Sequence, residues 1–160
     1  MSDYDGSDND LPGYFVGIPI GEQEVGRAHV TILVREGSTP EDVVSIINDM
    51  KEELSEVLPL VIHIQPEVKM FGHNNDIPVH PVRFVHPEHE AILKQFYRKY
   101  YKQKPGHTPH PELEPHVSVD GKERKETVDF IFNQSNGVYI ARSIQLKMIG
   151  DKEVKFQVEK

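Results

Sequence analysis

The 160-residue sequence contains no cysteine and no tryptophan. Without cysteine the chain has no disulfide bond, no thiolate metal ligand and no nucleophilic thiol. No apolar stretch approaches the length of a membrane span, and the first residues lack the basic and apolar regions of a signal peptide. We therefore expect a cytoplasmic protein, in a cell or in an infected host cell, that does not contact a membrane.

Positive charge is also scarce. The chain has 18 Lys and Arg residues against 26 Asp and Glu residues, for a net charge of −8. Because affinity for a phosphate backbone depends on clustered Lys and Arg, we expect no extended track for nucleic acid. Four aspartates and no basic residue lie in the first ten positions. We expect residues 1–12 to form a disordered acidic leader, whose simplest role is to aid solubility, and residues 13–160 to form one monomeric domain.

Two tripeptides carry most of the chemical information. They are His29-Val30-Thr31 and His116-Val117-Ser118, and each lies in an alternating apolar run that predicts a β-strand. Residues i and i+2 of a strand point to the same face, so each histidine shares a face with its own hydroxyl residue. If the fold places the two strands side by side, two imidazoles and two hydroxyls face one groove.

This set of side chains suits the cleavage of a phosphodiester. One group must remove a proton from the attacking oxygen and another must protonate the leaving oxygen, and histidine titrates near neutral pH. The hydroxyls of Thr31 and Ser118 can donate hydrogen bonds to the phosphate oxygens. The scheme requires no cofactor and no metal. The alternative is that both histidines are structural residues of half-buried strands.

The tripeptides and the order of the elements between them resemble the 2H phosphoesterase superfamily, which is named for two His-x-Thr/Ser motifs. The matching features are a helix at 40–58, a strand ending at Phe71-Gly72, a strand at 82–85, a helix at 87–103, the Pro115-His116 entry to the second motif and a last strand at 144–148. The resemblance implies an α+β bilobal fold. In that fold two antiparallel sheets flank a central groove, helices lie outside, and each lobe contributes one motif.

The resemblance also implies a function. His29 and His116 would be the acid and base, and Thr31 and Ser118 would hold the phosphate, in a metal-independent phosphodiesterase that hydrolyses a small cyclic or 2′-5′-linked nucleotide. Viral members of the superfamily that degrade cyclic oligonucleotide immune signals are one such type. Two alternatives stay open. The protein could resemble the 2′,3′-cyclic phosphodiesterases and RNA ligases that act on RNA ends, or it could be a non-catalytic nucleotide-binding module.

Substrate-binding residues are expected in two places. Arg98, Lys99 and Lys102 belong to a basic, tyrosine-rich stretch at 94–104, which is either a solvated helix face or a rim that attracts phosphate and stacks one tyrosine on a base. The first predicted strand, at 13–20, leads into the groove. We expect Tyr14 or Phe15 on this strand to reach a base.

The remaining histidines have simpler interpretations. His63 lies in a predicted strand at 60–64 and is expected to be structural. The segment 105–115 and the histidine that follows it include several residues of metal-binding type, namely His107, His110, Glu112, Glu114 and His116. Prolines interrupt this segment and no zinc motif is present, so we expect no metal site there. We expect this segment to be a mobile flap, and residues 73–78 to be a second one.

The first predicted helix has a well-defined start. Thr39 is a candidate N-cap, Pro40 occupies the first helical position, and Asp42 follows three residues after the cap. Apolar residues then recur at helical spacing as far as Val57. This stripe is expected to pack in the core.

Overall fold

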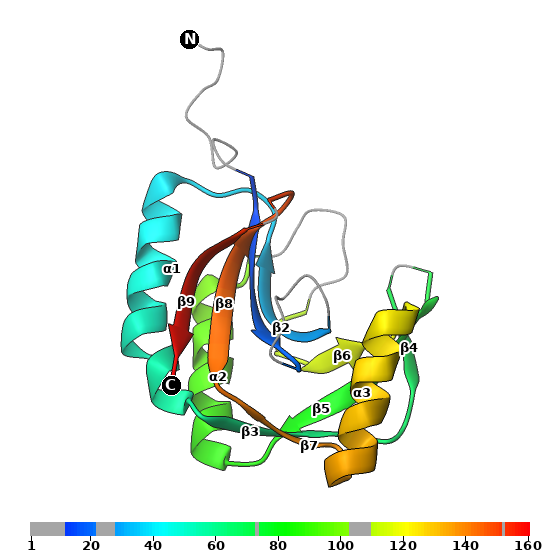
Figure 1. Ribbon diagram of the computed structural model, residues 1–160. Coiled ribbons are helices and arrows are strands. Elements are labelled where there is room, and N and C mark those ends of the chain that lie inside the picture. The colour runs from blue at the N-terminus through cyan, green and yellow to red at the C-terminus, as the bar shows by residue number, and fades with distance from the viewer. Residues whose placement is uncertain (1–11, 22–27, 73, 103–109, 152) are drawn as a thin grey trace.

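A computed structural model describes residues 12–21, 28–72, 74–102, 110–151 and 153–160 of the chain, which form a mixed α+β fold (Figure 1). Within these residues the helices are α1 (Pro40–Glu52), the 3-10 helix η1 (Leu54–Val57), α2 (Pro87–Tyr100) and α3 (Lys122–Ser135). The strands are β1 (Tyr14–Pro19), β2 (His29–Arg35), β3 (Leu60–Ile64), β4 (Lys69–Phe71), β5 (Ile77–Phe84), β6 (His116–Ser118), β7 (Val138–Ala141), β8 (Ser143–Met148) and β9 (Val154–Glu159). None of the described helices is long and apolar enough to cross a membrane.

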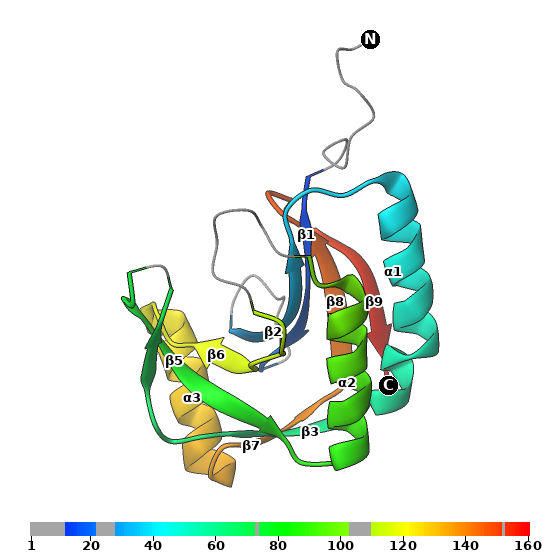
Figure 2. The ribbon, with the colours of Figure 1, turned by 180° about the vertical axis from the view of Figure 1, so that it is seen from behind.

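The strands form one curled antiparallel sheet (Figures 1 and 2). Their order is β7-β3-β5-β6-β2-β1-β8-β9, and β4 pairs with β5 outside this path. The two strands that carry the tripeptides, β2 and β6, are neighbours in the middle of the order. The α+β class is therefore confirmed. The expected pair of separate sheets is not confirmed, because strand pairing continues through β5, β6 and β2.

The start of α1 agrees with the sequence prediction. The Thr39 hydroxyl accepts a hydrogen bond from the Asp42 backbone amide at 3.1 Å, and the Asp42 carboxylate accepts one from the Thr39 amide at 3.3 Å. Pro40 occupies the first turn. The end differs, because α1 stops at Glu52 and η1 covers the rest of the expected 40–58 segment. The helix expected at 87–103 likewise ends earlier, at Tyr100.

The first two helices lie side by side against the sheet, and α3 lies apart from them (Figure 2). One apolar cluster joins α1, α2 and the strands, and its fully buried members include Val16, Ile18, Val30, Ile32, Ile46, Leu93, Phe96 and Leu146. Polar contacts add to the packing between the helices. The Tyr100 hydroxyl of α2 donates to the Asp49 carboxylate of α1, and Lys99 Nζ lies 2.6 Å from the same carboxylate. Val30 and Ile32 of β2 therefore pack in the same apolar core as α1 and α2.

Helix α3 and strands β7 and β9 were not predicted from the sequence. The helix begins after Gly121, whose φ of 107° lies in the left-handed region that favours glycine. Only Val128 and Ile131 of α3 are buried. With so few buried positions, the apolar periodicity that marks a helix in a sequence is weak.

We expect the substitution Thr39→Ala to lower the free energy of unfolding by about 1 kcal/mol, because it removes the hydroxyl that caps α1. Urea unfolding followed by circular dichroism measures the change. Thr127→Ala in α3 is the control, because the Thr127 hydroxyl donates only within its own helix, to the Glu123 carbonyl. Equal stability of Thr39→Ala and the unsubstituted protein would show that the cap contributes nothing.

Candidate active site

The two tripeptides meet through the pairing of β2 with β6. Val30 lies opposite Val117 in this antiparallel pair. The same register places His29 across from Ser118, and Thr31 across from His116. Val30 and Val117 are fully buried on one face. The two histidines and two hydroxyl residues therefore share the other face, as the strand periodicity predicts.

These four side chains line one small cavity of about 50 Å3, together with Arg124 of α3. All five residues are half-buried, so they can be reached from solvent. In this register the two histidines are diagonal neighbours, and the Cβ atoms of such neighbours lie roughly 7 Å apart. A group of the size of a phosphate can contact both imidazoles at that separation.

Apolar residues flank this polar patch on both neighbouring strands. On β1, Gly17 lies opposite Thr31 and Pro19 lies opposite His29. On β5, Pro81 lies opposite His116 and Val79 lies opposite Ser118. Directly opposed residues share a face of the sheet, so the histidines and hydroxyls are bordered by apolar or absent side chains.

The backbone orients the second histidine. His116 Nδ1 lies 2.8 Å from the carbonyl oxygen of Glu114. A carbonyl can only accept, so Nδ1 must carry the proton of this hydrogen bond, and Nε2 is left to take or give a proton. The Phe71 ring lies 4.5 Å from the His116 ring between centroids. These two contacts hold the imidazole in place.

The first histidine also has an aromatic neighbour. The rings of Phe15 and His29 are 5.7 Å apart between centroids. Phe15, which the sequence placed among the substrate-binding residues, therefore lies beside the cavity. On the second strand, the Ser118 hydroxyl oxygen accepts a hydrogen bond from the Asp120 amide at 3.2 Å. The hydroxyl proton of Ser118 then remains available to donate to a ligand.

Arg124 is the residue of the cavity that the sequence did not predict. It lies near the start of α3, so it could not be placed while that helix went unpredicted. The available signal was Gly121 followed by strong helix formers, with Val128, Ile131 and Phe132 at helical spacing. An arginine guanidinium binds phosphate oxygens through paired N–H donors. The described residues that line the cavity include no carboxylate, so its charge favours an anion.

A second pocket, of about 290 Å3, adjoins this cavity and shares Thr31 and His116 with it. We call it the side pocket. Its other walls come from the β2 residues next to Thr31, from Phe71, from α2 and from the segment before β6. The last two of these walls consist of Tyr97 of α2, Tyr101 directly after α2, and His110, Glu112, Leu113 and Glu114 before β6. The first tripeptide and the tyrosine-rich helix thus border one space.

The structure corrects two of the expected substrate-binding residues. Tyr14 is 0% exposed and packs in the core under Arg35, whose Cζ lies 6.0 Å from the ring centroid, so it cannot reach a base. Lys99 faces α1, where it contacts Asp49 and Glu53. It holds two helices together and does not lie at the rim of the groove. In both cases a core or interhelical contact, which the sequence does not reveal, takes the side chain.

Arg98 and Lys102 have different positions. Arg98 Nη2 lies 2.9 Å from Glu112 Oε2, so it reaches the side pocket through a carboxylate of its wall. Lys102 is exposed just after α2 and lines neither the cavity nor the side pocket.

The other histidines that the structure describes do not line the cavity. His63 is half-buried on β3, where its Nε2 lies 3.3 Å from the Asn136 carbonyl oxygen. His107 and the prolines at 105 and 109 lie outside the described residues, as do residue 73 and most of the leader. His110 is exposed, and its backbone amide donates to the Tyr101 hydroxyl at 2.7 Å.

In the described ranges no three His, Asp or Glu side chains are close enough to bind a metal ion. The two flaps remain predictions.

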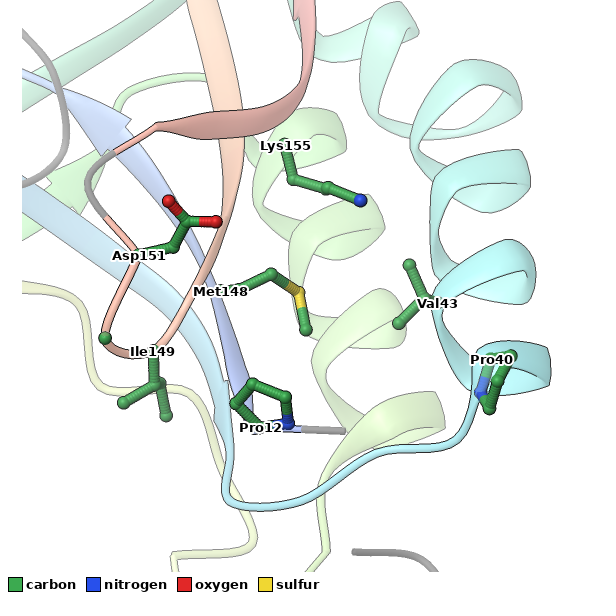
Figure 3. A pocket seen from close by; sticks show the side chains of 8 residues that line it. Pro12, Pro40, Val43, Met148, Ile149, Asp151 and Lys155 are labelled. Atoms are coloured by element: carbon green, nitrogen blue, oxygen red, sulfur yellow. The ribbon is translucent and has the colours of Figure 1, made fainter. Parts of the chain in front are cut away.

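A larger cavity, of about 600 Å3, lies between the start of α1 and the β8–β9 hairpin (Figure 3). Apart from Asp151 and Lys155, its lining is apolar or glycine, with Val43 and Met148 on facing elements. It shares no residue with the histidine cavity. A choice of site by cavity volume alone would therefore miss the two histidines, which are the groups that can transfer protons.

Comparison of the chain with models of known protein families finds no match, and comparison with curated proteins finds none. The resemblance to the 2H phosphoesterases therefore stays a prediction, which depends on the two tripeptides and on the order of the elements between them.

We expect nitrogen-15 NMR at pH 8 to show neutral His116 as the Nδ1–H tautomer, because a carbonyl oxygen faces Nδ1. His80 is the internal reference, since its Nδ1 lies 2.8 Å from the Gln65 carbonyl oxygen. A predominant Nε2–H tautomer at His116, with His80 as expected, would contradict this geometry.

Proposed function

We propose that this protein is a metal-independent phosphodiesterase that hydrolyses a small cyclic or 2′-5′-linked nucleotide by two-histidine acid/base catalysis. One observation carries the proposal. His29, Thr31, His116 and Ser118 line one cavity together with Arg124. The set supplies two proton-transfer groups, two hydroxyl donors and one fixed positive charge.

The reaction follows from these roles. One imidazole removes a proton from a water molecule while the water oxygen forms a bond to phosphorus. The other, protonated imidazole gives its proton to the ribose oxygen as the bond between that oxygen and phosphorus breaks. The product is a phosphomonoester, and the two imidazoles exchange protonation states in each turnover. Proton exchange with solvent then restores the starting state.

Negative charge on the phosphate oxygens rises during this displacement. The hydroxyls of Thr31 and Ser118 and the guanidinium of Arg124 line the cavity and can donate hydrogen bonds to these oxygens. The neighbouring Gly17 and Val79 have no polar side-chain atoms, so they do not compete for these donors. The site thus favours the transition state over the less charged ground state.

We also propose that the substrate is small and that the fold is that of the 2H phosphoesterases. The net charge of −8 opposes a long polyanion, and the side pocket has room for one nucleoside next to the phosphate. The two halves of the curled sheet, which meet at β2 and β6, would correspond to the two lobes of a 2H phosphoesterase.

We expect His29→Ala and His116→Ala each to lower kcat by on the order of 10²–10⁴-fold, because each removes one proton-transfer partner. Steady-state hydrolysis of 2′,3′-cyclic nucleotides and 2′-5′ oligoadenylates measures the change. His63→Ala is the matched control, because it removes a half-buried histidine of β3 that lies outside the cavity. Thr31→Val and Ser118→Ala should have smaller effects, of about 10–10³-fold.

Near-normal turnover in either cavity variant, with the control also active, would refute the two-histidine mechanism. A comparable loss in His63→Ala would attribute the effect to folding.

We expect kcat/KM to rise and then fall between about pH 5 and 9, because one histidine must be neutral and the other protonated in the reacting state. The rising limb of the profile reports the pKa of the histidine that acts as the base, and the falling limb reports the pKa of the histidine that acts as the acid. Replacing either histidine should remove one limb in the residual activity. A flat profile, under conditions where the chemical step limits the rate, would contradict this assignment.

A further inference from the structure

The side pocket has aromatic walls that are already in place. Tyr97 and Tyr101 stack on each other with ring centroids 5.3 Å apart and planes 20° apart. The Tyr97 hydroxyl donates to the carbonyl oxygen of His110, and the Tyr101 hydroxyl accepts from the amide of the same residue. Burial raises the pKa of Tyr97 to about 12, so its hydroxyl keeps the donated proton at neutral pH. Fixed aromatic rings bind flat groups with little loss of conformational entropy.

The side pocket is mostly apolar, but its wall also contains carboxylates, although it adjoins a cavity that suits an anion. Glu112 and Glu114 both belong to its wall. Two carboxylates beside a bound phosphate are unfavourable unless the ligand offers hydrogen-bond donors to them. Hydrogen bonding from Arg98 lowers the pKa of Glu112, so this carboxylate is ionised and can only accept. Arg98 contacts Oε2 of Glu112, and Oε1 remains to accept from a ligand.

A flat ligand that presents N–H donors fits both features. Nucleobases are flat, and their edges differ in donor pattern. Guanine presents two adjacent donors, N1–H and the N2 amino group, which match a carboxylate. Adenine and cytosine each present one amino group beside an acceptor nitrogen. Uracil presents one N–H between two carbonyl oxygens, which would face the carboxylate unfavourably.

We propose that the side pocket binds the nucleobase next to the scissile phosphate and selects bases that carry an amino group, guanine above all, through Glu112. This inference depends on the proposed function, because the phosphate is taken to lie at the histidines. Thr31 and His116 belong to both spaces, so a phosphate there and a base in the side pocket are adjacent parts of one ligand. In this arrangement Arg98 is a positioning residue, which holds Glu112 and does not contact the phosphate.

The test compares the binding of four bases. Calorimetry at pH 7 measures the Kd of guanosine, adenosine, cytidine and uridine monophosphates, in both the 3′ and the 5′ series. We expect guanosine to bind about tenfold or more tightly than uridine in at least one series. In Glu112→Gln this ratio should fall to near one, because an amide donates as well as accepts. Glu153→Gln, which changes an exposed residue before β9, is the matched control and should keep the ratio.

A second variant separates stacking from hydrogen bonding. Tyr101→Leu should weaken all four nucleotides by a similar factor of about tenfold and leave the order of the bases unchanged. Equal binding of the four bases to the unsubstituted protein would overturn the inference, as would an unchanged ratio in Glu112→Gln or no binding at millimolar concentration.

Hydrolysis of the corresponding 2′,3′-cyclic nucleotides distinguishes this inference from the proposed function. Selective binding without hydrolysis of any phosphodiester would support the base pocket and refute the enzyme. Hydrolysis with no difference in binding or in kcat/KM among the bases would support the enzyme and refute the base pocket.

Discussion

The contact between β2 and β6 is the constraint on which the rest of the site depends. A single residue pair, Val30 with Val117, sets the register of two short segments that are far apart in the chain. A shift of one residue would turn one tripeptide to the opposite face, because side chains alternate along a strand. Burial of both valines opposes that shift, since a slipped strand would place a histidine or a hydroxyl in the apolar core.

The surrounding elements give this pair its chemical setting. Strands β1 and β5 border it with glycine, proline and valine, and Arg124 comes from α3. On the other side, α2 and the residue that follows it supply the two tyrosines of the side pocket. Helix α2 is itself held to α1 by Lys99 and Tyr100. The proposed site therefore combines a fixed polar centre with an aromatic recess for the rest of a ligand. The 600 Å3 cavity has neither feature, so it plays no part in the proposal.

Local patterns in the sequence predicted most of the strands, the capping box of α1 and the shared face of each histidine and hydroxyl. Each of these features depends on residues that are close together in the sequence, so the sequence alone is sufficient to predict it. The position of Arg124 depends on α3, whose few buried residues gave a weak pattern. The errors at Tyr14 and Lys99 have a different cause, because a tyrosine or lysine is equally compatible with solvent, a groove or an interhelical contact. The single curled sheet also required knowledge of which strands pair across the middle.

The most direct test of the central claim is a product analysis in the presence of EDTA. The purified protein is incubated with 2′,3′-cyclic nucleotides, 2′-5′ and 3′-5′ oligoadenylates and cyclic dinucleotides, and products are resolved by mass. A variant that combines His29→Ala and His116→Ala is the negative control. We expect at least one substrate to gain one water molecule per cleaved phosphodiester, and only with the unsubstituted protein. Turnover that requires an added divalent metal, or that persists in the double variant, or no turnover of any substrate, would contradict it.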